Sequence, residues 1–167
     1  PANYANVLKQ VAASTGNNPA QIAVTASFAP LNGALQGVVL MMGATPRGEA
    51  SVELISMISG APAESVQQAM NILVGLRLVN RSTRYAEPYY HLHPLTYAFA
   101  YDRLRTSERL EGLQAKVKET VLEYAEGYSN APSPESFNKL ATEMNTFLAV
   151  ARLAGSALYQ PVPRAGL

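Results

Sequence analysis

Apolar side chains recur at three- and four-residue spacing over most of the chain, which is the pattern of amphipathic helices. In the first half this spacing predicts five helices, near residues 4–11, 20–29, 31–42, 49–59 and 63–76. Turn-forming sequences separate them, including GNNP at 16–19 and TPRG at 45–48. The first half of the chain is therefore expected to be helical.

A β-hairpin is predicted directly after these helices. Residues 77–80 and 89–92 have the composition of strands, and they flank a polar stretch that contains Ser82, Thr83 and Glu87. Helix, turn, helix, turn, helix and then hairpin is the order of elements in a winged helix, where the loop between the strands is the wing. We therefore expect a winged-helix domain at residues 33–105, preceded by a helical linker at 1–32.

Two helices with matched apolar stripes are predicted in the last third of the chain. The first follows a helix opened by His93-Pro94, begins at Thr106 or Ser107, and has the stripe Leu110, Leu113, Val117, Val121, Tyr124 and Tyr128. The second begins at Ser133 and has the stripe Phe137, Leu140, Met144, Phe147 and Ala151. A short turn between them predicts an antiparallel helical hairpin at 106–158, followed by a tail at 159–167. The expected fold class is mainly α.

The composition limits the cell compartments and the kinds of binding partner that can be expected for this chain. The chain of 167 residues has no Cys and a formal net charge of +1, so disulfides are excluded and bulk electrostatics do not attract DNA or membranes. No signal peptide or membrane span is evident, and we expect a cytoplasmic protein. No charged residue lies between Lys9 and Arg47. This stretch is interpreted as an Ala-rich helical region, or alternatively as a face that packs against a neighbouring domain.

The motifs of common catalytic sites are absent from the sequence. No G-x-x-x-x-G-K-[ST] loop is present to bind nucleotide phosphates, and no G-x-S-x-G turn is present for a serine nucleophile. Without Cys there is no catalytic thiol. His91 and His93 could face the same side of a strand as a metal pair, but no third ligand is evident. We therefore expect neither an enzyme nor a metal site.

DNA is a common partner of winged helices, which makes a transcriptional regulator an alternative interpretation. The outward stripe of the third helix, Glu64, Gln67, Gln68, Asn71 and Gly75, contains no Lys or Arg. Recognition helices usually use several cations, so this stripe argues against DNA. In the alternative, Gln67, Gln68 and Asn71 contact bases while Arg81 and Arg84 contact phosphates. Nucleic acid is thus an unlikely but open partner.

Three stretches carry a resemblance to a known family: VVLMMGATPRGEASVELISMISG at 38–60, ILVGLRLVNRS at 72–82 and YYHLHPLTYAFAYDRL at 89–104. Through them, residues 36–104 resemble the winged-helix domain of STAND-class signalling ATPases, the group that contains NB-ARC proteins. The stretch NYANVLKQVAASTG is similar to the family's linker after the ATPase core, and ESFNKLATEMNTFLAVARLAG is similar to the first helix of its repeat region.

The resemblance implies a role for one histidine. His93 matches the histidine of the family's Met-His-Asp motif, which contacts a nucleotide phosphate in the closed, ADP-bound state. Pro94 stands in place of the motif's Asp, so no role of that acid carries over. Independently, His93 precedes a helix whose first N–H groups favour an anion, although it could equally be a plain cap.

The resemblance implies a non-catalytic regulatory fragment of a larger signal-transduction ATPase. The chain itself is expected to hold no cofactor, whereas the parent protein binds ADP or ATP. The expected partners are an upstream ATPase core and a downstream repeat domain of the same polypeptide. A second alternative is a helical protein-interaction module that uses the uncharged N-terminal face, with Val38 and Val39 as its test positions.

Overall fold

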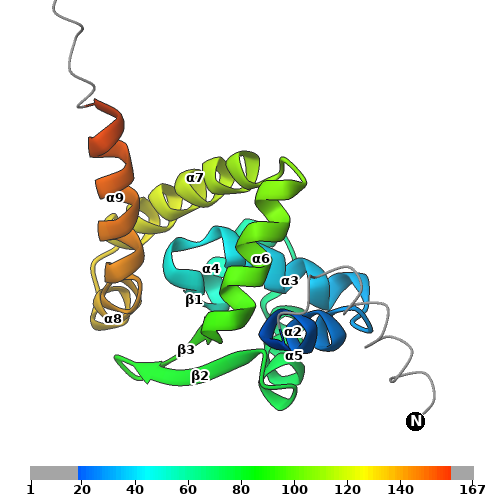
Figure 1. Cartoon of the computed structure of the whole chain (residues 1–167). Helices are drawn as coiled ribbons and strands as arrows, with labels where there is room; N and C mark the ends of the chain where they lie inside the picture. Colours follow the sequence, from blue (N-terminus) through cyan, green and yellow to red (C-terminus); the bar gives the residue numbers. More distant parts are fainter. Residues whose placement is uncertain (1–18, 159–167) are drawn as a thin grey trace, which may run out of the picture.

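The computed structural model describes residues 19–158, which form a mainly helical structure with a small antiparallel sheet (Figure 1). In chain order the elements are α2 (Pro19–Phe28), α3 (Gly33–Ala44), the 3-10 turn η1 (Pro46–Gly48), β1 (Glu49–Ser51), α4 (Val52–Ser59), α5 (Ala63–Gly75), β2 (Val79–Arg84), β3 (Glu87–Leu92), α6 (Pro94–Thr106), α7 (Leu110–Ser129), α8 (Pro134–Thr142) and α9 (Met144–Leu158). The expected class, mainly α, is confirmed for these residues. The helix expected at 4–11 and the tail at 159–167 lie outside the described part.

The helix α3 supplies much of the core. Asn32 caps its N-terminus, because the Asn32 side chain accepts a hydrogen bond of 2.9 Å from the N–H of Leu35. Val39 is fully buried, and α6 packs so closely that a Cβ at Gly43 would lie 2.7 Å from the Cβ of Ala100. The uncharged stretch between Lys9 and Arg47 therefore contains residues of the hydrophobic core.

Three short strands form the sheet in the order β1–β3–β2, with both pairs antiparallel. The central strand β3 places His91 opposite Asn80 of β2 and Glu49 of β1. Side chains alternate along a strand, and Tyr90 accordingly faces the hydrophobic core while Tyr89 faces the opposite side. The sheet therefore has one apolar face and one polar face.

The predicted β-hairpin is confirmed, with strands longer than expected. Ser82 and Thr83 belong to β2, and Glu87 begins β3, so the expected polar loop is mostly strand. The turn consists of Tyr85 and Ala86, which both have a positive φ, as in a type I′ hairpin turn. The connection between the strands is therefore short.

The expected helix at 49–59 is wrong in its first residues. Glu49–Ser51 form the strand β1, and the helix α4 begins only at Val52. Ser51 caps it by accepting a hydrogen bond of 3.2 Å from the N–H of Leu54, and Gly60 ends it with φ 72°. The strand thus converts directly into the helix at a capping serine.

The C-terminal helices contain one buried apolar stripe and one that is only partly buried, in which Phe147 packs against the core beside the Tyr124 ring. In α7 the predicted stripe is buried, with Val117, Val121 and Tyr124 in the core. The single helix expected after Ser133 is instead two helices, α8 and α9, separated at Glu143. Of the stripe expected there, Phe137 is 64% exposed and Met144 is 47% exposed. The buried side chains on these helices are largely polar: Ser136, Thr142, Glu143 and Thr146.

Helices α7, α8 and α9 lie together on one side of the structure, and the tip of the β2–β3 hairpin reaches toward α8 (Figure 1). The core cluster includes side chains from both expected segments, 33–105 and 106–158. Packing therefore continues across the expected boundary at 105/106.

Candidate functional site

His93 lies at the N-terminus of α6, in the short connection that follows β3. Its backbone N–H donates a hydrogen bond of 3.0 Å to the carbonyl of Leu78, and its carbonyl accepts one of 2.9 Å from the N–H of Tyr97. Pro94, at the first helical position, has the fixed φ that a helix start favours. The backbone of His93 is therefore held on both sides.

The imidazole of His93 is exposed and caps α6. Its Nδ1 accepts a hydrogen bond of 3.3 Å from the N–H of Leu95. A nitrogen that accepts carries no hydrogen, so the neutral ring has its proton on Nε2. This places one free donor in solvent at the positive end of a helix whose first turn contains no acidic residue. The arrangement suits an anion.

The residues of the nucleic-acid alternative are only partly available. Gln67 donates hydrogen bonds to the hydroxyl of Tyr90 at 2.7 Å and to the Asn71 side chain at 3.1 Å. Arg84 forms an ion pair of 3.0 Å with Glu49. Three others, Gln68, Asn71 and Arg81, are exposed. The two cations of the wing are therefore not equivalent, because one of them is already neutralised.

A buried carboxylate joins the C-terminal helices to the sheet. Glu143 is fully buried and accepts hydrogen bonds from the N–H of Ser51 at 2.7 Å, from the Thr146 hydroxyl at 2.8 Å and from the Tyr89 hydroxyl at 3.4 Å. Burial raises the pKa of Glu143, while these hydrogen bonds offset part of the effect. Burial followed by the charge of Glu143 raises the pKa of Tyr89.

A second cluster links the same surfaces beside Glu143. Lys139 of α8 forms ion pairs with Glu87 of β3 at 3.0 Å and with Glu53 of α4 at 3.3 Å. Tyr128 of α7 donates a hydrogen bond to Glu53, and burial with this contact raises the pKa of the Tyr128 hydroxyl. These contacts connect α7 and α8 to β3 and α4. The helix α9 is connected through Thr146, which donates to Glu143.

Sequence reasoning singled out His93, whose role stays a prediction, and missed Glu143 and Lys139. Both lie in the second C-terminal segment, where only an apolar stripe was sought. The apolar spacing held no signal for them, because Leu140 and Met144 are separated by a regular four-residue helical step. Among the described residues no group of three or more His, Cys, Asp or Glu is placed to hold a metal ion.

Comparisons with protein-family models, curated proteins and solved structures find no match to this chain. Within residues 19–158, no helix combines the length and the apolarity that crossing a bilayer requires.

Proposed function

We propose that the chain is a non-catalytic regulatory region of a nucleotide-dependent signalling ATPase of the STAND class, with a winged helix at 33–105 and a helical hairpin at 106–158 in which α8 and α9 replace the single second helix. The order α3, β1, α4, α5, β2, β3 supports the winged-helix assignment, as does the sheet order β1–β3–β2. The ATPase core and a repeat domain are the proposed partners, and the cytoplasm is the proposed location.

The observation that carries the proposal is the position of the His93 ring. The free Nε2–H lies in solvent beside the N-terminus of α6, where a phosphate oxygen could accept from it. In the proposed closed state this end of α6 docks on an upstream core, and His93 donates to a phosphate of bound ADP. Exchange for ATP then releases the module as a rigid body, because the ADP contact favours only the closed state.

The polar junction around Glu143 supports a relay to the C-terminal helices. A displacement of the sheet acts on α8 and α9 through the Glu143–Ser51 hydrogen bond and the two ion pairs of Lys139. These contacts favour joint movement of the sheet and the C-terminal helices over sliding of one on the other. The signal would thereby reach any helical repeats that follow.

The test is His93→Ala in the full-length protein that contains this chain. We expect faster ADP release and higher basal activity, since the phosphate loses a donor. His93→Asn is the matched control for capping, because Asn can still accept from the N–H of Leu95 but does not carry the imidazole Nε2–H. Fast release in both variants, with thermal stability kept in His93→Asn, supports sensing. ADP release at the wild-type rate in His93→Ala removes the sensing claim.

A helical protein-interaction module is the second candidate, and exposed apolar side chains favour it. Phe137, Met144 and Leu148 are each about half exposed or more, at 64%, 47% and 49%. Val38 and Val39, which the sequence placed on the uncharged N-terminal face, are 6% and 0% exposed, so a charge there is expected to unfold the core. Dimerisation of the chain that is lost in Phe137→Glu and kept in Phe137→Leu would favour this candidate.

A DNA-binding regulator remains the third candidate, with Gln68, Asn71 and Arg81 as its exposed residues. A salt-dependent shift on mixed duplex DNA, abolished by Arg81→Ala, would favour it over the other two.

A further inference from the structure

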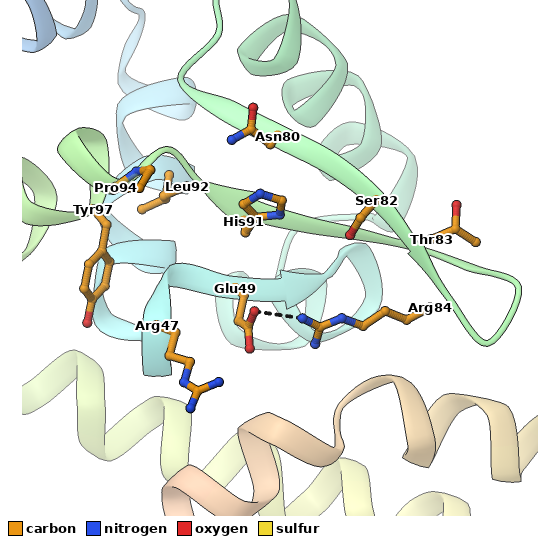
Figure 2. A pocket seen from close by; sticks show the side chains of 10 residues that line it. All are labelled: Arg47, Glu49, Asn80, Ser82, Thr83, Arg84, His91, Leu92, Pro94 and Tyr97. Atoms are coloured by element: carbon orange, nitrogen blue, oxygen red, sulfur yellow. Dashed lines mark hydrogen bonds and ion pairs between the residues drawn. The ribbon is translucent and has the colours of Figure 1, made fainter.

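A cavity of about 750 Å³ opens on the polar face of the sheet. Figure 2 shows side chains from η1, all three strands and the start of α6 around it. The volume falls within the range of small-molecule sites, which is roughly 300–1,000 Å³. The cavity is distinct from the ring of His93, which is not among its lining residues.

The sheet register explains why the cavity lies at this place. At one end of β3 the polar face is covered, because Tyr89 contacts Glu143 and Thr146 of the C-terminal helices. Two residues further along, His91 lies between Asn80 and Glu49 and has only intermediate exposure. The C-terminal helices therefore cover the polar face of the sheet at Tyr89 and leave it open at His91.

The turn η1 places a guanidinium at the rim of the cavity. Arg47 has φ 60°, a left-handed conformation that a non-glycine residue adopts only under local constraint. The constraint comes from its neighbours: Pro46 opens the turn, and Gly48 lies so close to Tyr97 that a Cβ would be 2.6 Å from the ring. Figure 2 shows Arg47 extending below Glu49.

The polar side chains of the cavity have unused donors. Arg84 is paired with Glu49 at 3.0 Å, and no partner within the described residues is found for the side chains of Arg47, Asn80 or His91. By contrast, every buried side-chain nitrogen and oxygen of the described part has a hydrogen-bond partner. Two guanidinium groups against one carboxylate leave an excess of one positive charge. The cavity therefore offers neutral donors from His91 and Asn80 on one side of Glu49, and the positive charge of Arg47 on the other side (Figure 2).

We propose that this cavity binds the phosphate group of a small phosphorylated molecule. Arg47 supplies the charge, His91 and Asn80 supply further hydrogen-bond donors, and the Tyr97 ring forms a wall for the remainder of the ligand. Charge-assisted hydrogen bonds from a guanidinium are suited to phosphate oxygens. The ion pair of Glu49 holds Arg84 at the far side of the site.

Calorimetric titration of the whole chain at low ionic strength tests the proposal, with inorganic pyrophosphate and with ADP as separate probes. Equal affinities show that the phosphate alone is recognised, and tighter ADP binding shows that the nucleoside also contacts the cavity. We expect roughly tenfold weaker binding of the pyrophosphate in Arg47→Asn and in His91→Ala. Asn is chosen at position 47 because it tolerates positive φ.

A matched control distinguishes this cavity from nonspecific attraction of an anion. Lys118→Met removes an exposed cation from α7, which does not line the cavity, and this variant should bind pyrophosphate as the wild type does. Failure of the wild type to bind either probe, or an equal loss in Lys118→Met, overturns the proposal. Loss of binding in Arg81→Ala or His93→Ala, with wild-type affinity in Arg47→Asn and His91→Ala, also overturns it and locates the anion on the opposite face of β2 or at α6.

Discussion

The carboxylate of Glu143 accepts a hydrogen bond of 2.7 Å from the backbone N–H of Ser51, so the break between α8 and α9 is fastened to the end of β1. Ser51 also caps α4 through its side chain. Ser51 therefore has two roles: its backbone binds the junction of α8 and α9, and its side chain caps the start of α4. Glu143 is fully buried, and its environment makes its ionisation a sensitive measure of this junction.

The stability of the wild type relative to Glu143→Gln should fall as pH rises. Burial raises the pKa of Glu143 above its ordinary value of 4.5, so the native state keeps a proton that the unfolded chain has released. The associated stability is complete below 4.5 and is lost as pH rises through the native pKa. Urea unfolding of both proteins between pH about 4.5 and 8 measures the difference, about 1.4 kcal/mol for each tenfold rise in proton affinity.

Glu143→Gln is the matched variant because an amide can accept from Ser51 and donate to Thr146. A difference in unfolding free energy that stays constant with pH would contradict the raised pKa. Glu143→Leu should be less stable than Glu143→Gln by about 1–3 kcal/mol, since it leaves the N–H of Ser51 buried without a partner.

Two glycines of α3 should respond oppositely to the same substitution. A Cβ at Gly43 would meet the Cβ of Ala100 at 2.7 Å and its carbonyl carbon at 3.2 Å, whereas a Cβ at Gly37 meets nothing within 4 Å. We expect Gly43→Ala to lower the free energy of unfolding by about 1–3 kcal/mol. Gly37→Ala should raise it by up to about 1 kcal/mol, because Ala is the better helix former. Chemical unfolding of both variants checks the contrast, and a stabilised Gly43→Ala would show that α6 can move away from α3.

The apolar pattern predicted the helices well because most of them bury an apolar stripe. The stripe of α7, with Val117, Val121 and Tyr124, is buried as expected. The same reasoning was only partly right for α8 and α9. Phe147 packs against the core, but Ser136, Thr142 and Thr146 are buried around Glu143. A face buried through hydrogen bonds is not marked by apolar residues, so the apolar spacing also selected Phe137, which is exposed.

The strand β1 could not be predicted for a different reason. The strand consists of only three residues, Glu49–Ser51, and a helical pattern follows it directly. Their extended conformation comes from pairing with β3, some forty residues later, and local propensity does not contain that information. The same holds for the cavity, because Arg47 and His91 come together only when β1 pairs with β3.

Ala86→Gly should stabilise the β2–β3 turn. Ala86 has φ 66°, in the left-handed region that costs an L-residue about 1–2 kcal/mol and costs glycine almost nothing. Part of that gain is lost to the greater freedom of glycine in the unfolded chain, so we expect a net rise of about 0.5–1 kcal/mol in unfolding free energy. Ala98→Gly, at an exposed position of α6, is the control and should be destabilising by about 1 kcal/mol. Equal destabilisation by both changes would contradict a strained turn.

Lys139→Met should weaken the junction between α8 and the sheet. Burial by itself lowers the pKa of Lys139, but the hydrogen bonds and charges of Glu87 and Glu53 outweigh it, and the net pKa is raised. The variant leaves these two carboxylates without their shared cation. Because the Glu53 and Glu87 side chains are 33% and 29% exposed, solvent partly screens the two pairs, and we expect a loss of about 1 kcal/mol.

A double-mutant cycle of Lys139→Met with Glu87→Gln measures the pair directly, and the expected coupling is about 0.5–1 kcal/mol, smaller in high salt. Lys118→Met, at an exposed position of α7, serves as the control for loss of a lysine and should leave stability within about 0.5 kcal/mol. A coupling indistinguishable from zero at low salt would mean that the Lys139 contacts do not hold α8 against β3. The proposed relay from the sheet to α8 and α9 would then depend on Glu143 alone.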